Sequence, residues 1–339
     1  MFEFLIEYGL FLLKAVTILV AIVVVISFAA ATKKSSKQEG LEVEDLNQKN
    51  KDLSDGLQKA ILRKDEWKTK LKKDKAKIKS DAKKKKSRPK AYVIDFIGDL
   101  KASAVPALRE EVNAILNVAK KNDQVIVRLD NHGGVVHEHG LAASQLVRIR
   151  EKNINLIVMV DKVAASGGYL MACVANKIYA APFAILGSIG VIAQLPNFNR
   201  LLDSHGVDFE QVTAGQYKRN VTMFGKNTDE DRAKLKDQLE EVHDLFKSSV
   251  SDYRPSMDLD KVATGEHWYG KKALELGLAD EIKTSDELLI EMGKKYDIFS
   301  VKFKLKQPLK KRLMSGVDSL FARFEDIKWR RKFEGQLPR

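Results

Sequence analysis

The sequence predicts a layered α/β domain that follows a single N-terminal membrane anchor. From Ala91 onward, short β-rich runs alternate with helical stretches, which is typical of a sheet with helices packed against it. An uncharged apolar run covers residues 15–31. The formal net charge of +13 lies in two basic arms: residues 32–90 carry +11 and residues 300–339 carry +8, whereas residues 91–299 carry −5.

These observations divide the 339 residues into five parts. They are a short N-terminal segment (1–9), a transmembrane anchor (10–31), a lysine-rich arm that is helical or disordered (32–90), a globular domain (91–299) and a basic amphipathic C-terminal arm (300–339). With 44% apolar residues the chain can bury a sizeable core, most naturally in one domain of about 200 residues.

The predicted anchor spans 22 residues, 10–31, and Lys14 is its single charged residue. A helix needs roughly 20 residues to cross a bilayer, and Lys14 can extend its amine toward the interface. A cleaved signal peptide is the alternative, because Ala29 and Ala31 resemble a small-x-small cleavage site. The segment before Lys14 carries two glutamates and no basic residue, which favours an uncleaved anchor.

The arm after the anchor has too few apolar residues to build a core. Leu46, Leu53, Leu57 and Ile61 recur at helical spacing, and a lysine run follows over 72–90. Attraction to anionic lipid and a plain solvated linker both remain open for this run. Specific nucleic-acid binding is disfavoured because no aromatic residues are interleaved for base stacking.

The globular domain contains alternating strand and helix signals. Strands are expected at 92–98, 124–130 and 154–161, with weaker stretches at 177–181 and 207–212 that would continue the sheet. Helices are expected at 105–120, 136–150 and, opened by a capping sequence, Thr228–Ser249. The single cysteine, Cys173, excludes an internal disulfide and lies in the apolar run LMACVA, so we expect a core residue rather than a nucleophile.

Ser166 lies in DKVAASGGYLMACVAN (161–176), where a strand should pass into a helix. Its hydroxyl would be close to the unpaired amides of the helix, and the small residues Gly167 and Gly168 would let a substrate backbone approach. A hydroxyl beside an amide donor is what acyl transfer requires of a nucleophile and its oxyanion site. The alternative is that Ser166 merely caps the helix.

A second glycine pair, Gly133 and Gly134, follows the preceding strand in LDNHGGVV (129–136). Two such turns after successive strands predict a shared crevice at their carboxyl ends, in which Gly133 or Gly134 supplies a second oxyanion donor.

Three histidines, His132, His137 and His139, lie near this glycine pair, so one of them could be the base of a Ser-His-Asp triad. The HEH spacing is not that of a helical zinc site, so a metal is disfavoured, and we expect surface or turn histidines rather than a base.

Four ordered motifs resemble the SppA/SohB signal peptide peptidases, a family of serine peptidases. They are HGGVV (132–136), AASGGY (164–169), LGSIGV (186–191) and TAGQYKR (213–219). The resemblance is closest to the SohB branch and covers roughly residues 91–300. It implies that the globular domain is a peptidase domain. Two positions depart from the family's usual pattern: Leu186 replaces a threonine, and Asn131-His132 replaces Ser-Pro.

The resemblance implies a membrane-anchored endopeptidase that uses a Ser-Lys dyad without metal or cofactor. Ser166 is then the nucleophile, Lys218 the general base and acid, and Ser188 the residue that orients the lysine, while Gly167 with Gly133 or Gly134 forms the oxyanion site. The implied fold is a crotonase-like or ClpP-like spiral of β-β-α units. The implied substrates are membrane-derived or signal peptides, and the implied assembly is a homo-oligomer.

Charge and resemblance disagree about topology. Basic residues directly after the span favour a cytoplasmic domain. The resemblance implies a bacterial inner-membrane protein with a periplasmic catalytic domain, which is the expectation we adopt.

Two other classes stay open, a crotonase-type acyl-CoA enzyme and an inactive membrane scaffold. The C-terminal arm has apolar residues on one helical face among basic ones, and lipid, a neighbouring subunit and the chain's own core are equal candidates to cover it.

Overall fold

The computed structural model describes residues 6–19, 22, 39–83, 88–215 and 217–305. Residues 41–303 form one compact unit, and residues 1–40 with 304–339 form another. Residues 6–19 are helical, and within the described ranges no helix is both long and apolar enough to cross a membrane. Most of the second half of the predicted anchor, and nearly all of the C-terminal arm, lie outside the described residues.

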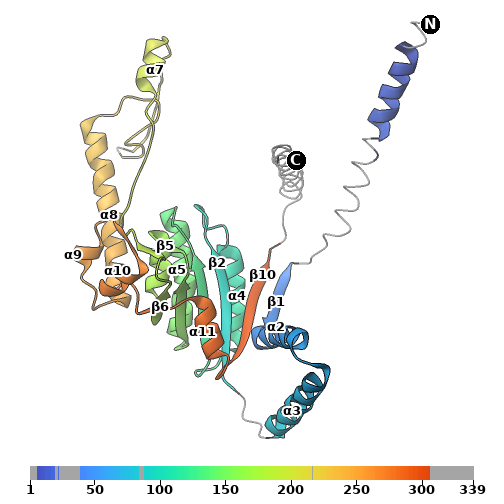
Figure 1. Ribbon diagram of the computed structural model, residues 1–339. Coiled ribbons are helices and arrows are strands. Elements are labelled where there is room, and N and C mark those ends of the chain that lie inside the picture. The colour runs from blue at the N-terminus through green and yellow to red at the C-terminus, as the bar shows by residue number, and fades with distance from the viewer. Residues whose placement is uncertain (1–5, 20–21, 23–38, 84–87, 216, 306–339) are drawn as a thin grey trace, which may run out of the picture. The chain divides into compact units, whose positions relative to one another are not determined.

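Seven of the described strands form one sheet in the order β1-β10-β2-β3-β4-β6-β9 (Figure 1). Their bounds are β1 Gly40–Asp45, β2 Lys90–Ile97, β3 Gln124–Asp130, β4 Asn155–Val160, β6 Lys177–Ala180, β9 Glu281–Ile282 and β10 Asp297–Lys304. The pairs from β10 across to β9 are parallel. A smaller sheet has the order β5-β7-β8, with bounds β5 Val163–Ala165, β7 Ile185–Gly187 and β8 His267–Tyr269.

The helices connect these strands. Their bounds are α2 Leu46–Ile61, α3 Lys64–Lys83, α4 Val105–Val118, α5 Val136–Glu151, α6 Gly167–Cys173, α7 Asn199–Ser204, α8 Asp229–Tyr253, α9 Leu259–Val262, α10 Gly270–Glu275 and α11 Ser285–Met292. The expected cap of α8 is confirmed: Thr228 Oγ1 accepts from the Asp231 amide, and the Asp231 carboxylate accepts from the Thr228 amide.

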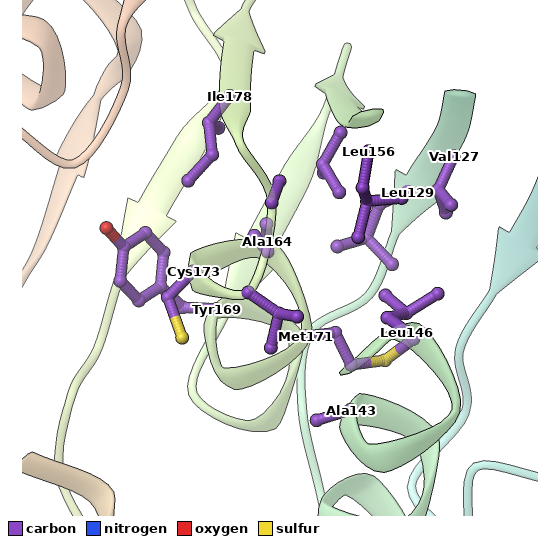
Figure 2. Close-up of a cluster of buried hydrophobic side chains, with 14 of the residues drawn as sticks. Val127, Leu129, Ala143, Leu146, Leu156, Ala164, Tyr169, Met171, Cys173 and Ile178 are labelled. Atoms are coloured by element: carbon purple, nitrogen blue, oxygen red, sulfur yellow. The ribbon is translucent and has the colours of Figure 1, made fainter. Parts of the chain in front are cut away.

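Alternation along the central strands sends side chains to two cores, one on each face of the large sheet. Tyr92, Ile94 and Phe96 of β2 belong to the core that includes α4, α5 and α6, whereas Ala91 and Val93 belong to the core under α11. Figure 2 shows part of the first core, where side chains of α5 and α6 meet those of β3 and β4. The site described below lies on the side of the first core, next to α5 and α6.

The central strands and helices agree with the sequence expectations, and two segments differ. Residues 207–212 are not a strand, because in the structure their side chains are exposed and they pair with no neighbour. Within the predicted arm, β1 joins the edge of the large sheet, although its side chains are almost all exposed.

Both ends of the α2–α3 hairpin hold the same turn of the domain. Asn47 Oδ1 accepts from the Ile298 amide (2.6 Å), and its Nδ2 donates to the Gly293 and Tyr296 carbonyls (3.2 Å each). Arg88, on the other side of the hairpin, donates to the same two carbonyls (2.6 and 2.9 Å). The α2–α3 hairpin is thus bonded at both of its ends to the turn that precedes β10.

Candidate active site

Ser166 occupies a strained turn between β5 and α6. Its φ of 52° and ψ of −121° lie outside the regions that residues with a Cβ prefer, and its amide donates to the Gly187 carbonyl (2.8 Å). Its side chain makes no capping bond to α6, so the interpretation of Ser166 as a helix cap is wrong. Strained strand-to-helix turns that leave a hydroxyl uncommitted are typical of nucleophiles.

The two glycine segments meet at this serine. Gly133 has a φ of 86°, and a Cβ built on it would lie 2.7 Å from Ser166 Cβ and 2.8 Å from the Gly167 nitrogen. The Gly133 amide donates to Asn131 Oδ1 (2.9 Å). Within the described part of the chain, neither the Gly134 nor the Gly167 amide has a hydrogen-bond partner. The structure thus offers two uncommitted N–H donors, on neighbouring segments, beside one hydroxyl.

Ser188 repeats the geometry of Ser166 on the adjacent strand. Strands β5 and β7 pair in parallel with Ala165 opposite Gly187, so the two serines follow paired residues. Ser188 also has a positive φ, 53°, and its amide donates to the Glu266 carbonyl (2.6 Å). The structure therefore brings Ser188 next to the turn that carries Ser166.

The histidines are not all on the surface as expected. His132 and His137 are exposed, but His139 is completely buried, because α5 turns its side chain toward α6. Its Nδ1 lies 3.0 Å from the Val135 carbonyl and its Nε2 lies 3.2 Å from Asn131 Oδ1. Both ring nitrogens of His139 lie near acceptor oxygens other than Ser166 Oγ, and a neutral imidazole can donate to only one of the two.

A cavity of about 840 Å³ opens beside Ser166. It runs between α5, α6 and α8 and has Gly134 and Gly167 at the end near the serine. Its apolar lining includes Ala143, Val147, Leu170, Val174, Val242, Leu245 and Phe246. The volume and lining suit an apolar side chain of a ligand whose reactive carbon lies at the serine.

Lys218 lies elsewhere in the single chain. It belongs to the excursion between β7 and α8 that also carries α7 (Figure 1), its side chain is exposed, and its amide donates to the Gly215 carbonyl (3.2 Å). It lines a separate cavity of about 570 Å³ with Phe209, Met223 and Phe224. No residue lines both cavities, so within one chain the structure does not bring Lys218 to Ser166.

Cys173 is a core residue, as expected. It is fully buried in the cluster of Figure 2, and burial raises the pKa of its thiol to about 12. A thiol with such a pKa stays protonated and is not a nucleophile at neutral pH.

Sequence reasoning missed Asn131 and His139 as parts of the site. Asn131 directly precedes the first glycine pair, and its side chain is buried against both glycine segments. The signal for His139 was its spacing: it falls on one helical face with Ala142, Leu146 and Ile149, all of which are buried.

A strained serine with a free hydroxyl, two uncommitted amides and an adjoining apolar cavity define a hydrolase that works by acyl transfer. The model for the peptidase family S49 N-terminal region matches residues 3–146, and the model for peptidase family S49 matches residues 148–298. The chain belongs to peptidase family S49, and it is a serine peptidase.

Several curated relatives support the same assignment. The chain is 47% identical to "Probable protease SohB" of Haemophilus influenzae over 90% of each chain. It is 52% identical to "Probable protease SohB" of Buchnera aphidicola subsp. Acyrthosiphon pisum over 69% of each. Among solved structures, a variant of the 1510-N membrane-bound stomatin-specific protease with a substrate peptide aligns at a TM-score of 0.42 and 14% identity, over 68% of this chain and 99% of its own.

Proposed function

We propose that this serine peptidase is an endopeptidase that cleaves membrane-derived or signal peptides with a Ser166–Lys218 dyad. The observation that carries the proposal is Ser166 itself, whose strained turn leaves the hydroxyl without a capping bond and next to two free amides. Of the two glycines first considered for the second donor, Gly134 is favoured, because the Gly133 amide is already bonded to Asn131.

The proposed reaction has two halves. The neutral amine of Lys218 takes the proton of Ser166 Oγ, which attacks a peptide carbonyl, and the oxyanion lies between the amides of Gly134 and Gly167. Protonated Lys218 then gives its proton to the leaving amine, and water hydrolyses the acyl-enzyme by the same route. Ser188 orients the lysine.

Assembly is part of the proposal. A lysine amine has an ordinary pKa of about 10.4 and must lose water to act as a base near neutral pH. In the single chain Lys218 is exposed and lines a different cavity from Ser166. The excursion that carries it exposes several large apolar side chains, including Ile192, Val212 and Tyr217. We propose a homo-oligomer that covers this excursion and dries the lysine.

The substrate class is supported by the cavity beside Ser166 and by one relative. An apolar side chain next to the scissile bond would fill the space between α5, α6 and α8. A putative signal peptide peptidase SppA of Enterococcus faecium is 29% identical over half of each chain. The SohB relatives described above are named only as probable proteases, so they support proteolysis and not a substrate class.

Location and finer fold complete the proposal. The apolar run of residues 10–31 is proposed as a bacterial inner-membrane anchor, with the peptidase domain in the periplasm. The spiral of β-β-α units is supported by strand order: β4 and β6 lie in the large sheet, and the strands that directly follow them, β5 and β7, lie in the small one.

The test uses purified full-length protein in detergent and an unfolded apolar peptide. Wild-type protein should cleave internal bonds and react with a fluorophosphonate probe at Ser166. Lack of labelling would favour an acyl-CoA enzyme or an inactive scaffold. A reporter fused after Arg339 reads the side of the membrane.

A further inference from the structure

We propose that Asn131 and His139 form a positioning pair that aims the oxyanion amides at the reaction centre of this peptidase. The inference rests on the proposed roles of Ser166, Gly134 and Gly167. Neither residue of the pair touches the reacting atoms, and both act through the two glycine segments.

Asn131 ties the first glycine segment to the strand that carries the nucleophile. Its amide donates to the Val163 carbonyl (2.8 Å), and its carbonyl accepts from the Ala165 amide (3.0 Å). Its side-chain Oδ1 accepts from the Gly133 amide (2.9 Å). The Gly133 N–H is held by this bond, whereas the next amide, that of Gly134, has no partner among the described residues.

His139 fixes the side chain of Asn131. Its Nε2 lies 3.2 Å from the same Oδ1 atom, so one oxygen is shared between the ring and the Gly133 amide. The amide nitrogen of Asn131 faces the sulfur of Met171 (3.4 Å), which leaves the oxygen facing its two partners. The Val135 carbonyl lies 3.0 Å from Nδ1, and since both neighbours are acceptors, a neutral ring donates to Asn131 Oδ1 only in the tautomer that carries its proton on Nε2.

The same pair supports the second glycine segment by direct contact. A Cβ on Gly167 would lie 2.5 Å from His139 Cγ, and a Cβ on Gly168 would collide with the Asn131 carbonyl oxygen. The backbone of Gly167 therefore packs directly against the imidazole of His139. One buried pair thus contacts both segments that supply the proposed oxyanion donors.

Packing alone does not require this polar pair. The neighbouring positions on the inner face of α5 are Ala142, Leu146 and Ile149, and a leucine could fill the place of His139. Two fully buried polar side chains carry a desolvation cost that only their hydrogen bonds offset. A role in holding amides at the geometry of the oxyanion explains why the helix presents an imidazole here.

The experiment compares His139→Leu, which keeps volume and removes both ring contacts, with His139→Gln, whose amide nitrogen can reach Asn131 Oδ1. Full-length protein is assayed with a chromogenic apolar peptide. His139→Leu should lower kcat by about 10- to 100-fold with KM within about twofold, because a lost oxyanion donor costs about 100- to 1,000-fold and misplacement costs less. His139→Gln should recover most of that loss.

A second measurement, inhibition by a peptide aldehyde, separates the orientation of the oxyanion amides from the stability of the fold. A peptide aldehyde forms a hemiacetal whose oxygen occupies the oxyanion site, so His139→Leu should weaken its inhibition by about the same factor as kcat. Binding of the corresponding peptide amide should stay unchanged. Leu146→Ala is the matched control, since it removes a fully buried side chain two turns along the same helix and should lower stability but not kcat.

Several results would overturn the inference. Wild-type kcat and aldehyde inhibition in His139→Leu, or losses no different from those of Leu146→Ala, reduce the pair to a structural role. Additive losses in Asn131→Ser and His139→Leu would show that they are not a unit. If His139→Leu does not fold, Asn131→Ser carries the same comparison. Turnover that survives Ser166→Ala instead overturns the proposed function, whichever way the His139 variants behave.

Discussion

The two halves of the proposed dyad lie in very different surroundings. The turn of Ser166 is surrounded by packed elements: β5 and β7 pair beneath it, α5 and α6 contact each other beside it, and its amide is bonded to Gly187. The excursion of Lys218 has exposed side chains along most of its length, with Val212 97% and Ile192 74% exposed.

This difference teaches that the fold of one chain already holds the proposed nucleophile in place, whereas the proposed base needs a further surface to cover its excursion. Preorganised groups need no rearrangement when the reaction begins, and a conditional base offers a point of control. Variants can test the two regions separately. Substitutions around the packed turn of Ser166 should change both activity and stability, whereas substitutions in the exposed excursion should change activity alone.

The largest effect is expected from Ser166. Ser166→Ala should reduce peptide cleavage by more than about a thousandfold, since it removes the hydroxyl that attacks the peptide carbonyl in the proposed reaction. Ser166→Gly should be equally inactive yet more stable by about 1 kcal/mol, because glycine relieves a strained backbone. Urea unfolding measures the second effect, and a Ser166→Gly protein less stable than Ser166→Ala would refute the assignment of strain.

Lys218→Ala should abolish cleavage to a similar extent while changing the free energy of unfolding by less than about 0.5 kcal/mol, as expected for an exposed side chain. Mixing it with Ser166→Ala protein should restore part of the activity, because an intact serine and an intact lysine can then meet between chains. Lys234→Ala, on α8, removes a half-buried cation 5.0 Å from the Tyr217 ring and serves as the neighbouring lysine control. Full cleavage by Lys218→Ala alone would remove lysine from the mechanism.

Gly133→Ala tests how closely the two glycine segments must approach. The new methyl group would meet Ser166 Cβ and the Gly167 nitrogen in a backbone with a φ of 86°, so we expect a loss of about 100-fold in kcat and about 2–4 kcal/mol in stability. Gly277→Ala is the control, because its φ is 78° but its Cβ would meet no atom within 4 Å. Equal effects of the two substitutions would mean that backbone strain, not the contact with Ser166, is responsible.

The smallest effect on cleavage is expected from substitution of Glu111. This residue of α4 is a buried carboxyl in the packed part of the domain, not in the exposed excursion. Burial raises its pKa to about 7, although the Phe303 amide donates to its Oε1 (2.8 Å). The folded protein therefore keeps a proton that the unfolded chain loses above its ordinary value of 4.5. Stability should fall by up to about 3 kcal/mol as the pH rises from 4.5 to 7 and then level off.

Glu111→Gln keeps the acceptor for the Phe303 amide and removes the titration, so its unfolding free energy should lose this dependence on pH. Cleavage at a fixed pH should stay unchanged. Glu110→Gln, its exposed neighbour, should retain the wild-type profile. An identical pH profile in wild type and Glu111→Gln would show that this carboxyl does not govern the slope.

Much of the fold was predictable because the central strands and their helices carry their own periodic signals. Strands β2, β3 and β4 are apolar runs, and Thr228 marks the start of α8. Strands β5 and β7 have three residues each, too few for a period, and they are defined by pairing with each other and, for β7, with β8. Residues 207–212 show the converse, since their apolar pattern has no strand to pair with in the structure.

The candidate site was predictable to the extent that its chemistry lies in short motifs. Ser166, Ser188 and the two glycine pairs come together because their turns follow neighbouring strands. The roles of Asn131 and His139 depend on contacts between α5 and α6, which no local pattern contains. In the proposed function the place of Lys218 depends on a second copy of the chain that covers its excursion, and no pattern in one sequence contains that contact.

The double attachment of the α2–α3 hairpin has a mechanical consequence. Asn47 and Arg88 bind the same turn before β10, so a force applied at β1 would pass to this turn without passing through the hairpin between them. In the sheet order, β10, β2 and β3 lie between β1 and β4. Strand β4 is followed in the chain by β5 and then by the turn of Ser166. A force applied at β1 would therefore load the outer strands in shear before it reached the turn of Ser166.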